Sequence, residues 1–392
     1  MAARKIRMLQ WALPSIAFII LVVNALLLHR DISKIGVMEE IDDINSNNNM
    51  RKEYMRNRAK NFYSWYEGNK TETLLVNADK NGTIMDFAIV GFAKCGTTTM
   101  EANLAHIAPM PEEQDVCTPI HPTVYYAYKN WPQQYSAPDK EKLFRGTKCP
   151  AFIQGGWLAE WSKHLPRTKL IVGIRHPVLW FQSFWNQQLA NGNTRRFAGD
   201  DPYNVMRVCN PPNRKDCRQG CPTNQLLCMH RGRFHLALAA LGKTELTAEE
   251  RNILAAEDPD GGEDLINMNV INDVFLYEQQ TLGEDYVWDE LAKYLGAEQI
   301  PHDRRHNARG RGQDKAVDFC DGKYDEFRAK MMQISYEAAT WLQNFFIPLS
   351  KDESRTDVVI PRSDTFYELV ESYKLDPCEK LRRLDNGTYI LG

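Results

Sequence analysis

Short apolar runs alternate with helical patterns along the chain from residue 84 onward. The runs 84–90, 169–174 and 274–277 each end at a glycine or a charged residue, which is typical of buried strands. The pattern predicts helices over 97–107, from Pro177 to about 189, over 286–295 and over 324–346. Strands that alternate with helices favour an α/β fold, with a largely parallel central sheet flanked by helices.

The longest apolar run lies near the N-terminus, where residues 8–28 carry no charge over 21 positions. A helix of that length rises roughly 30 Å, enough to cross a bilayer core. Arg4, Lys5 and Arg7 precede it, and positive charge stays on the cytoplasmic side. A cleaved signal peptide is the alternative, but its shorter apolar core and small-residue cleavage site do not match. The run therefore predicts an uncleaved, single-pass anchor of type II.

The predicted organisation follows from this anchor. We expect a cytoplasmic tail (1–7), a transmembrane signal-anchor (8–29), a polar luminal stem (30–80) and a folded domain (81–392). Within the domain, residues 192–265 are predicted to be an insertion that carries a cysteine cluster and an acidic segment. The sequons at Asn69, Asn81 and Asn386 agree with a luminal, glycosylated domain.

Composition changes this picture in two ways. The net charge of −3 shows no overall basic excess, which argues against a nucleic-acid partner. All nine cysteines follow the apolar run and would face an oxidising compartment. The cluster Cys209, Cys217, Cys221 and Cys228 lacks the paired C-x2-C spacing of a zinc site, which favours disulfides. Because nine is odd, at least one thiol has no partner within the chain.

The segment Gly91–Thr99 (GFAKCGTTT) stands between the first predicted strand and the first predicted helix. Such a turn leaves free backbone N–H groups at the positive end of a helix, where an anion binds. Gly91 and Gly96 keep the glycine spacing of a nucleotide-binding P-loop. The P-loop lysine follows the second glycine, whereas Lys94 precedes it. A disulfide at Cys95 would distort this phosphate cradle, so we expect Cys95 to be the unpaired thiol. A glycine turn without a ligand is the alternative interpretation.

A second candidate anion site follows the strand 169–174. Arg175 ends this strand and would point into the crevice where α/β sheets bind ligands. Ser183 lies two turns into the next helix, so the two side chains together are suited to clamp one more phosphate.

The arrangement KxGTT at Lys94–Thr98, followed by Arg175-x-Pro177 and Ser183, resembles the donor site of sulfotransferases. The segment 146–152 (GTKCPAF) is similar to a segment of the Golgi carbohydrate sulfotransferases of the heparan sulfate type. The resemblance covers roughly residues 84–350, and His176, Trp180 and Cys149 depart from common family residues. It implies a P-loop NTPase-like sheet, a Golgi membrane location and the donor 3′-phosphoadenylyl sulfate (PAPS), whose 3′-phosphate ATP lacks.

By this resemblance, Lys94 neutralises the leaving group and Lys148 lies near the transferred sulfuryl group. The residues implied to bind the donor are Lys94, Cys95, Gly96, Thr97, Thr98, Thr99, Arg175, Ser183, Arg309 and Gly310. The last two belong to a basic stretch, 304–311, that would close over the nucleotide. The acceptor implied is a glycan hydroxyl, and no metal is required.

Sulfuryl transfer to a hydroxyl needs a general base, which the family places after the first helix. Glu113, Asp115 and His121 are the candidates in that segment, and the choice among them stays open. A protein tyrosine or a lipid is the alternative acceptor, and a non-catalytic luminal glycan-binding protein is the alternative of another class. A kinase or nucleotide hydrolase would need a lysine at position 97, where the sequence has threonine.

Overall fold

The computed structural model describes residues 85–108, 110, 144–150, 152–154, 158, 162, 165–190, 202, 233–239, 241–243, 248, 270–303, 316–383 and 389–391. All of them lie in the unit Lys70–Gly392. Within these residues, no helix combines the length and the apolar character needed to cross a bilayer. The predicted tail, anchor and stem lie outside the described residues.

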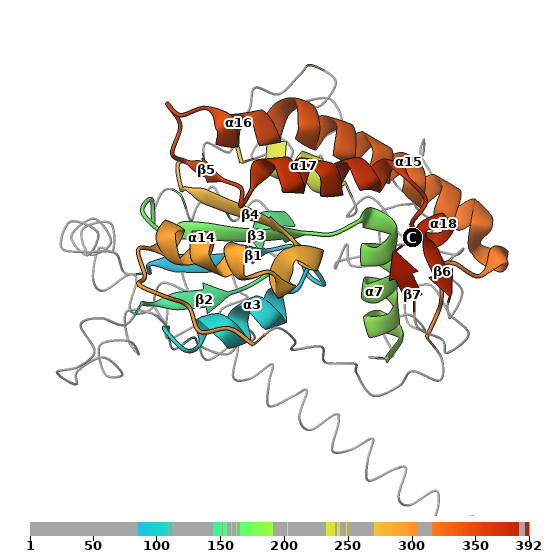
Figure 1. Ribbon diagram of the computed structural model, residues 1–392, viewed down its shortest axis with the longest axis horizontal. Coiled ribbons are helices and arrows are strands. Elements are labelled where there is room, and N and C mark those ends of the chain that lie inside the picture. Colours follow the sequence, from blue (N-terminus) through green and yellow to red (C-terminus); the bar gives the residue numbers. More distant parts are fainter. Residues whose placement is uncertain are drawn as a thin grey trace, which may run out of the picture. The chain divides into compact units, whose positions relative to one another are not determined.

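A parallel sheet forms the centre of the unit (Figure 1). Its strands are β1 (Phe87–Gly91), β2 (Gly146–Lys148), β3 (Lys169–Ile174), β4 (Val274–Glu278) and β5 (Val358–Val359). They lie in the order β2-β1-β3-β4-β5, and each neighbouring pair runs parallel. The sheet confirms the predicted α/β class.

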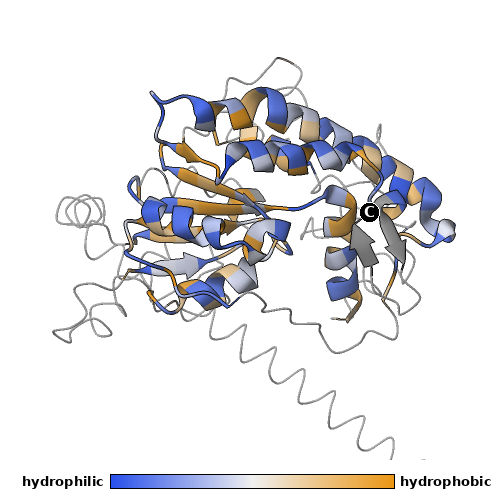
Figure 2. Ribbon diagram, viewed as in Figure 1, coloured by the Kyte–Doolittle hydropathy of each residue, from blue (hydrophilic) through white to orange (hydrophobic). Residues whose placement is uncertain are grey.

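The strands are apolar on both faces because helices cover both sides of a parallel sheet. In Figure 2, β1, β3, β4 and β5 are mostly hydrophobic, whereas β2 is not. Phe87 and Ile89 point to one face, whereas Ala88 and Val90 point to the other, which is the period of two of a strand. The sheet therefore separates two hydrophobic cores.

The first face is covered by α3 (Thr97–Leu104) and α14 (Asp285–Leu295), with the short helix η4 (Gln279–Gly283) leading into α14. Met100 and Leu104 of α3 pack into this core. The apolar positions of α14 recur at helical spacing and are buried, and Gly296 ends the helix with φ 82°.

The opposite face is covered by α7 (Pro177–Ala190), α11 (Phe234–Ala239), α15 (Asp325–Trp341) and α17 (Ser363–Glu371). A π-helical stretch (Leu342–Phe346) and α16 (Ile347–Lys351) continue α15. The remaining short elements are η2 (Phe152–Gln154), η6 (Gly322–Tyr324), η8 (Ser372–Lys374), α18 (Pro377–Lys380), and the antiparallel pair β6 (Leu381–Arg383) and β7 (Tyr389–Leu391).

The structure confirms the predicted strands at β1, β3 and β4 and the helices at α3, α7, α14 and α15. α11 lies inside the range 192–265, which the sequence predicted to be an insertion. Its Phe234 ring lies 4.5 Å from that of Phe92 and 5.4 Å from that of Trp180, centroid to centroid. Residues 234–239 therefore belong to the core of the domain rather than to an appendage.

Candidate functional site

The candidate site lies where the strand order reverses. The chain leaves β1 for β2 on one side and later adds β3 on the other, so β1 and β3 flank a topological switch point. Ligands of open α/β sheets bind at the carboxyl ends of the strands at such a point. The loop Gly91–Gly96 follows β1, and Arg175 follows β3. The two predicted anion-binding elements therefore meet at one edge of the sheet.

The backbone of the loop after β1 is shaped for an anion. Lys94 and Gly96 have positive φ values of 69° and 81°, and left-handed residues of this kind are typical of backbone cradles that bind anions. Among the described residues, the N–H groups of Lys94 and Gly96 make no backbone hydrogen bond. Gly96 is the N-cap of α3, and no side chain caps that helix end. These free donors, with the positive end of α3, form a cradle for a phosphate-like group.

Two side chains hold the loop from behind. The Trp180 Nε1–H donates a hydrogen bond of 2.7 Å to the Ala93 carbonyl, and the Tyr277 hydroxyl donates one of 3.0 Å to the Cys95 carbonyl. With their carbonyl groups bound on the core side, these peptides are fixed in orientation. The loop is thus preorganised in the absence of a ligand.

Glycine is required at two positions near the loop. A Cβ atom at Gly96 would lie 2.3 Å from the Leu282 side chain, and the φ of 81° disfavours any other residue. A Cβ at Gly173 on β3 would lie 2.8 Å from the Cys95 carbonyl oxygen. The loop therefore sits directly against β3.

Three cationic side chains converge on this loop. Burial lowers the pKa of Lys94, and the charges of Arg175 and Lys148 lower it further. The same charges that disfavour a proton on Lys94 favour a bound anion. Within the described part of the chain, Lys94 has no ion pair or hydrogen bond of its own.

Arg175 and Lys148 differ in how their charges are balanced. Burial lowers the pKa of Arg175, and its buried Nε atom has no hydrogen-bond partner among the described residues. Lys148 ends β2 and is almost fully buried, and its Nζ atom lies 2.6 Å from Oε2 of Glu101 on α3. Buried polar atoms without a partner are rare in proteins, and this one lies at the carboxyl end of β3, where it is a candidate donor to an anionic ligand.

Cys95 carries a free thiol, as predicted. Its side chain is fully buried in the core, and burial raises the pKa of the thiol well above its usual value. The thiol is therefore neutral and faces the protein interior, so only the backbone of this residue can face an anion.

The other predicted donor residues are spread around the cradle. Thr97 is buried in the first turn of α3, Thr98 is exposed and Thr99 is half-buried. Ser183 lies half-buried in α7, two turns after Pro177. Figure 1 shows α7 beyond the end of the sheet at which β3 ends, which is the side of the loop.

Several predicted residues lie outside the described part of the chain. They are the candidate bases Glu113, Asp115 and His121, the basic-loop residues Arg309 and Gly310, the sequons Asn69, Asn81 and Asn386, and the cysteine cluster 209–228. Their roles stay predictions.

The structure adds residues that the sequence reasoning missed. Trp180, taken from the sequence only as a departure from the family, supports the loop. Glu278 is a fully buried carboxyl beside Arg175, and a charged residue at the end of an apolar run was the available signal. Tyr373, which contacts Glu278, comes from a distant segment and left no local signal.

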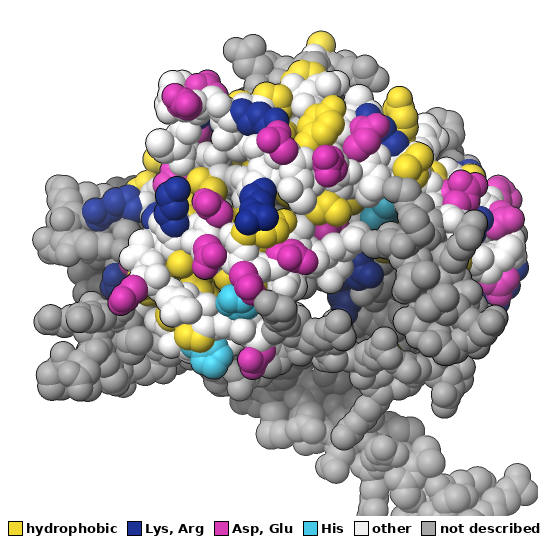
Figure 3. Space-filling view, viewed as in Figure 1, with side chains coloured by type: hydrophobic (Ala, Val, Ile, Leu, Met, Phe, Trp, Pro, Cys, Tyr) yellow, Lys and Arg dark blue, Asp and Glu magenta, His cyan; other side chains and the backbone are white. Residues whose placement is uncertain are grey.

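Two further properties describe the surroundings of the site. Among the described residues, no group of three or more His, Cys, Asp or Glu side chains is placed to hold a metal ion. On the face shown in Figure 3, acidic and basic side chains are interspersed rather than gathered by sign. The convergence of cations at the loop is thus a local feature.

The comparisons with known proteins are sparse. No family model and no curated protein matches the chain. A solved structure, a sulfotransferase from Alicyclobacillus acidocaldarius, is similar over 65% of this chain and 94% of its own, with 13% sequence identity and a TM-score of 0.39. A likeness this remote carries no argument about function, so the geometry of the site has to carry it.

Proposed function

We propose that the chain is a sulfotransferase that uses PAPS as its donor. The observation that carries this proposal is the convergence of Lys94, Lys148 and Arg175 on a loop with free N–H groups at the switch point. PAPS carries two anionic groups, a 5′-phosphosulfate and a 3′-phosphate. The site offers two anion-binding elements, the loop after β1 and the arginine after β3.

In this proposal, each element has a distinct task. The loop Gly91–Thr99 binds the 5′-phosphosulfate, and Lys94 neutralises the oxygen on which charge develops as the S–O bond breaks. Lys148, fixed by Glu101, lies against the transferred sulfuryl group. Arg175, with Ser183, binds the 3′-phosphate. As in phosphoryl transfer, positioning and charge stabilisation provide the catalysis.

The acceptor and the location are part of the same proposal. The segment 146–152 favours a glycan hydroxyl by resemblance, with a protein tyrosine or a lipid as the alternative acceptor. The apolar run 8–28 supports a type II protein of the Golgi membrane. The proton of the acceptor hydroxyl would pass to a base in the segment that contains Glu113, Asp115 and His121.

Calorimetric titration of the full chain tests the donor. We expect tight binding of adenosine 3′,5′-bisphosphate (PAP), weak binding of ATP, and loss of PAP binding in the double variant Lys94→Ala, Arg175→Ala. Lys293→Ala removes an exposed lysine of α14 and serves as the matched control. A folded chain that does not bind PAP would refute the proposal.

Transfer of labelled sulfate from PAPS then distinguishes among the three classes of acceptor. Label in glycans supports the proposed acceptor, whereas label only in tyrosine peptides or lipids replaces it. PAP binding without transfer to any of these classes would favour the non-catalytic alternative.

A further inference from the structure

A buried carboxyl group stands next to the arginine of the proposed donor site. Glu278 is the last residue of β4, and none of its surface is exposed. The Tyr373 hydroxyl donates to Oε1 at 3.1 Å, and the Gln280 N–H donates to Oε2 at 2.5 Å. Both oxygens are therefore engaged, and the carboxyl group is held in one place.

Glu278 and Arg175 lie close together at the carboxyl ends of neighbouring strands. Ile174 pairs with Glu278 in the parallel register, so Arg175 is the next residue along β3. The charge of each group shifts the pKa of the other toward its ionised form. No hydrogen bond joins them among those of the described residues, and Arg175 Nε has no partner. Glu278 thus offsets the charge of Arg175 but accepts no hydrogen bond from its Nε–H.

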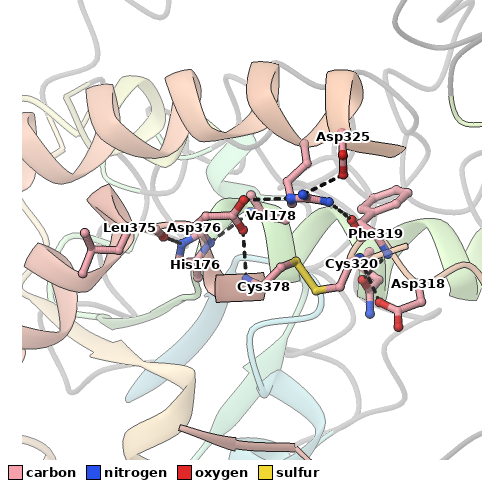
Figure 4. The surroundings of a disulfide bond; sticks show 11 residues. His176, Val178, Asp318, Phe319, Cys320, Asp325, Leu375, Asp376 and Cys378 are labelled. Atoms are coloured by element: carbon pink, nitrogen blue, oxygen red, sulfur yellow. Dashed lines mark hydrogen bonds and ion pairs between the residues drawn. A yellow bond between two sulfur atoms is a disulfide. The ribbon is translucent and has the colours of Figure 1, made fainter. Parts of the chain in front are cut away.

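The segment that carries Tyr373 holds Arg175 from a second side. The ring of His176 lies 5.2 Å from that of Tyr373, and its Nε2 lies 3.2 Å from the Leu375 carbonyl oxygen. The disulfide Cys320–Cys378 and the hydrogen bond between Arg328 and Asp376 fix this segment to the start of α15 (Figure 4).

The other titratable groups around Glu278 are either neutral near pH 7 or positively charged. Cys95, Tyr277 and Tyr373 have pKa values raised well above their usual range by burial, so they are neutral near pH 7. Tyr286 of α14 also has a raised pKa, chiefly from burial. Lys94 and Arg175 provide the positive charges, and the His176 ring packs on Tyr373. Within this described cluster, Glu278 is the carboxyl group whose charge acts on Arg175.

We propose that Arg175 exchanges Glu278 for the 3′-phosphate as its counter-ion when the donor binds, and that Glu278 takes up a proton from solvent in this exchange. This inference rests on the proposed function and extends it. A phosphate dianion beside Arg175 disfavours the ionised form of the buried Glu278 carboxyl, because like charges repel. The proton goes to Oε1, and the Tyr373 hydroxyl rotates from donating to accepting. The Gln280 N–H remains on Oε2, and the Tyr373 hydroxyl gives up Oε1 as the acceptor of its hydrogen.

The environment of Glu278 makes this proton uptake possible near neutral pH at a small free-energy cost. Burial raises the pKa of Glu278 to about 7. The hydrogen bonds from Gln280 and Tyr373 and the charge of Arg175 oppose this rise. The arriving phosphate raises it further. Binding that takes up a proton weakens as pH rises, because fewer protons are available to the bound state.

Calorimetry of PAP binding to the full chain tests the exchange. Titrations in two buffers of different ionisation enthalpy give the number of protons taken up, for the wild type, Glu278→Gln and the control Glu284→Gln. Glu284 is exposed, so this control makes the same charge change outside the cluster. At pH 8 the wild type should take up more protons than Glu278→Gln, by more than half a proton, and Glu284→Gln should match the wild type.

The affinities should change in parallel. Glu278→Gln should bind PAP about tenfold more tightly than the wild type at pH 8 and equally at pH 6, since a pKa of about 7 implies one decade per unit above it. Adenosine 5′-monophosphate lacks the 3′-phosphate and should show no difference between the two proteins. Equal proton uptake by the two proteins, or the same difference with the monophosphate, would overturn the exchange.

A second variant keeps the test decisive if Glu278→Gln does not fold. Tyr373→Phe removes a hydrogen bond that favours the ionised carboxyl, so the fall in PAP affinity should move to higher pH. An unchanged pH profile would contradict the proposal. If the wild type binds no PAP, the proposed function fails as well. If PAP binding depends on Arg175 but the wild type and Glu278→Gln take up equal numbers of protons, the exchange is rejected and the proposed function stands.

Discussion

The environments of two partly buried arginines, Arg175 and Arg328, differ sharply. Arg328 donates to three acceptors, at 2.8 Å to Asp376, at 2.7 Å to Asp325 and at 2.7 Å to the Phe319 carbonyl (Figure 4). Arg175 has a charged neighbour in Glu278, and its buried Nε atom has no acceptor in the part of the chain that the structure describes. A guanidinium group whose three nitrogen atoms all donate to the protein stabilises the fold, whereas one with a free buried donor is available to a ligand.

The same contrast extends to the segments around the two arginines. The segment around Arg328 is cross-linked by Cys320–Cys378 and by ion pairs, so its polar groups are satisfied within the chain. The loop Gly91–Gly96 has its carbonyl groups held by Trp180 and Tyr277, and its N–H groups are left free. We therefore expect changes in the first region to alter stability and changes in the second to alter ligand binding.

The largest expected effect is on the cross-linked region. Cys320→Ala together with Cys378→Ala opens a loop with a sequence separation of 58. The chain-entropy relation gives a loss of about 4 kcal/mol in the free energy of unfolding. Denaturant unfolding measures it, with PAP binding of the folded variant as the internal control. A loss below about 1 kcal/mol would show that the ion pairs alone hold this segment.

The pH dependence of stability should reveal the buried carboxyl of the second region. The folded pKa of Glu278, about 7, lies above the unfolded value of 4.5, so the folded chain holds this proton more tightly. The wild type should therefore lose stability relative to Glu278→Gln as pH rises from 4.5 through 7, by up to about 3 kcal/mol. Thermal unfolding of both proteins between pH 4.5 and 8 measures the difference. A difference that stays constant with pH would place the pKa of Glu278 near its ordinary value.

Exchanging the two arginines for alanine tests the comparison directly. Arg175→Ala should weaken PAP binding about 100-fold, since a charge-assisted pair of hydrogen bonds contributes about 3 kcal/mol. It should leave the free energy of unfolding nearly unchanged. Arg328→Ala should lower that free energy by about 2 kcal/mol and leave PAP binding intact. The two variants are each other's control, and the comparison fails if both lose stability and neither loses affinity.

The sequence predicted the parts of the molecule that are local along the chain. β1, β3 and β4 are continuous apolar runs, and the glycines of the loop after β1 stand in one short motif. β2 and β5 were not predicted, because strands of three and two residues are stabilised by neighbouring strands and have no sequence pattern of their own.

Contacts between distant segments could not be predicted in the same way. The Tyr373–Glu278 hydrogen bond joins residues 95 positions apart, and the Cys320–Cys378 disulfide joins residues 58 apart. Neither spacing follows from periodicity or from a motif. The donor side of the candidate site was therefore accessible from sequence, whereas the groups that tune Arg175 required the fold.

The smallest expected effect concerns the support of the loop by Trp180. Trp180→Phe keeps an aromatic ring against Phe184 and Phe234 but removes the N–H that holds the Ala93 carbonyl. A neutral hydrogen bond contributes about 1 kcal/mol, so PAP binding should weaken about fivefold as the left-handed Lys94 backbone relaxes. Calorimetric titration with PAP measures this change.

Trp185→Phe is the matched control for this last test, because Trp185 lies in the same helix and is fully buried. Its Nε1 atom has no hydrogen-bond partner within the described residues, so its loss should leave PAP binding unchanged. Equal weakening by the two variants would trace the effect to repacking of α7. Weakening by Trp180→Phe alone shows that the fixed carbonyl of Ala93 keeps the neighbouring N–H groups aimed at the ligand.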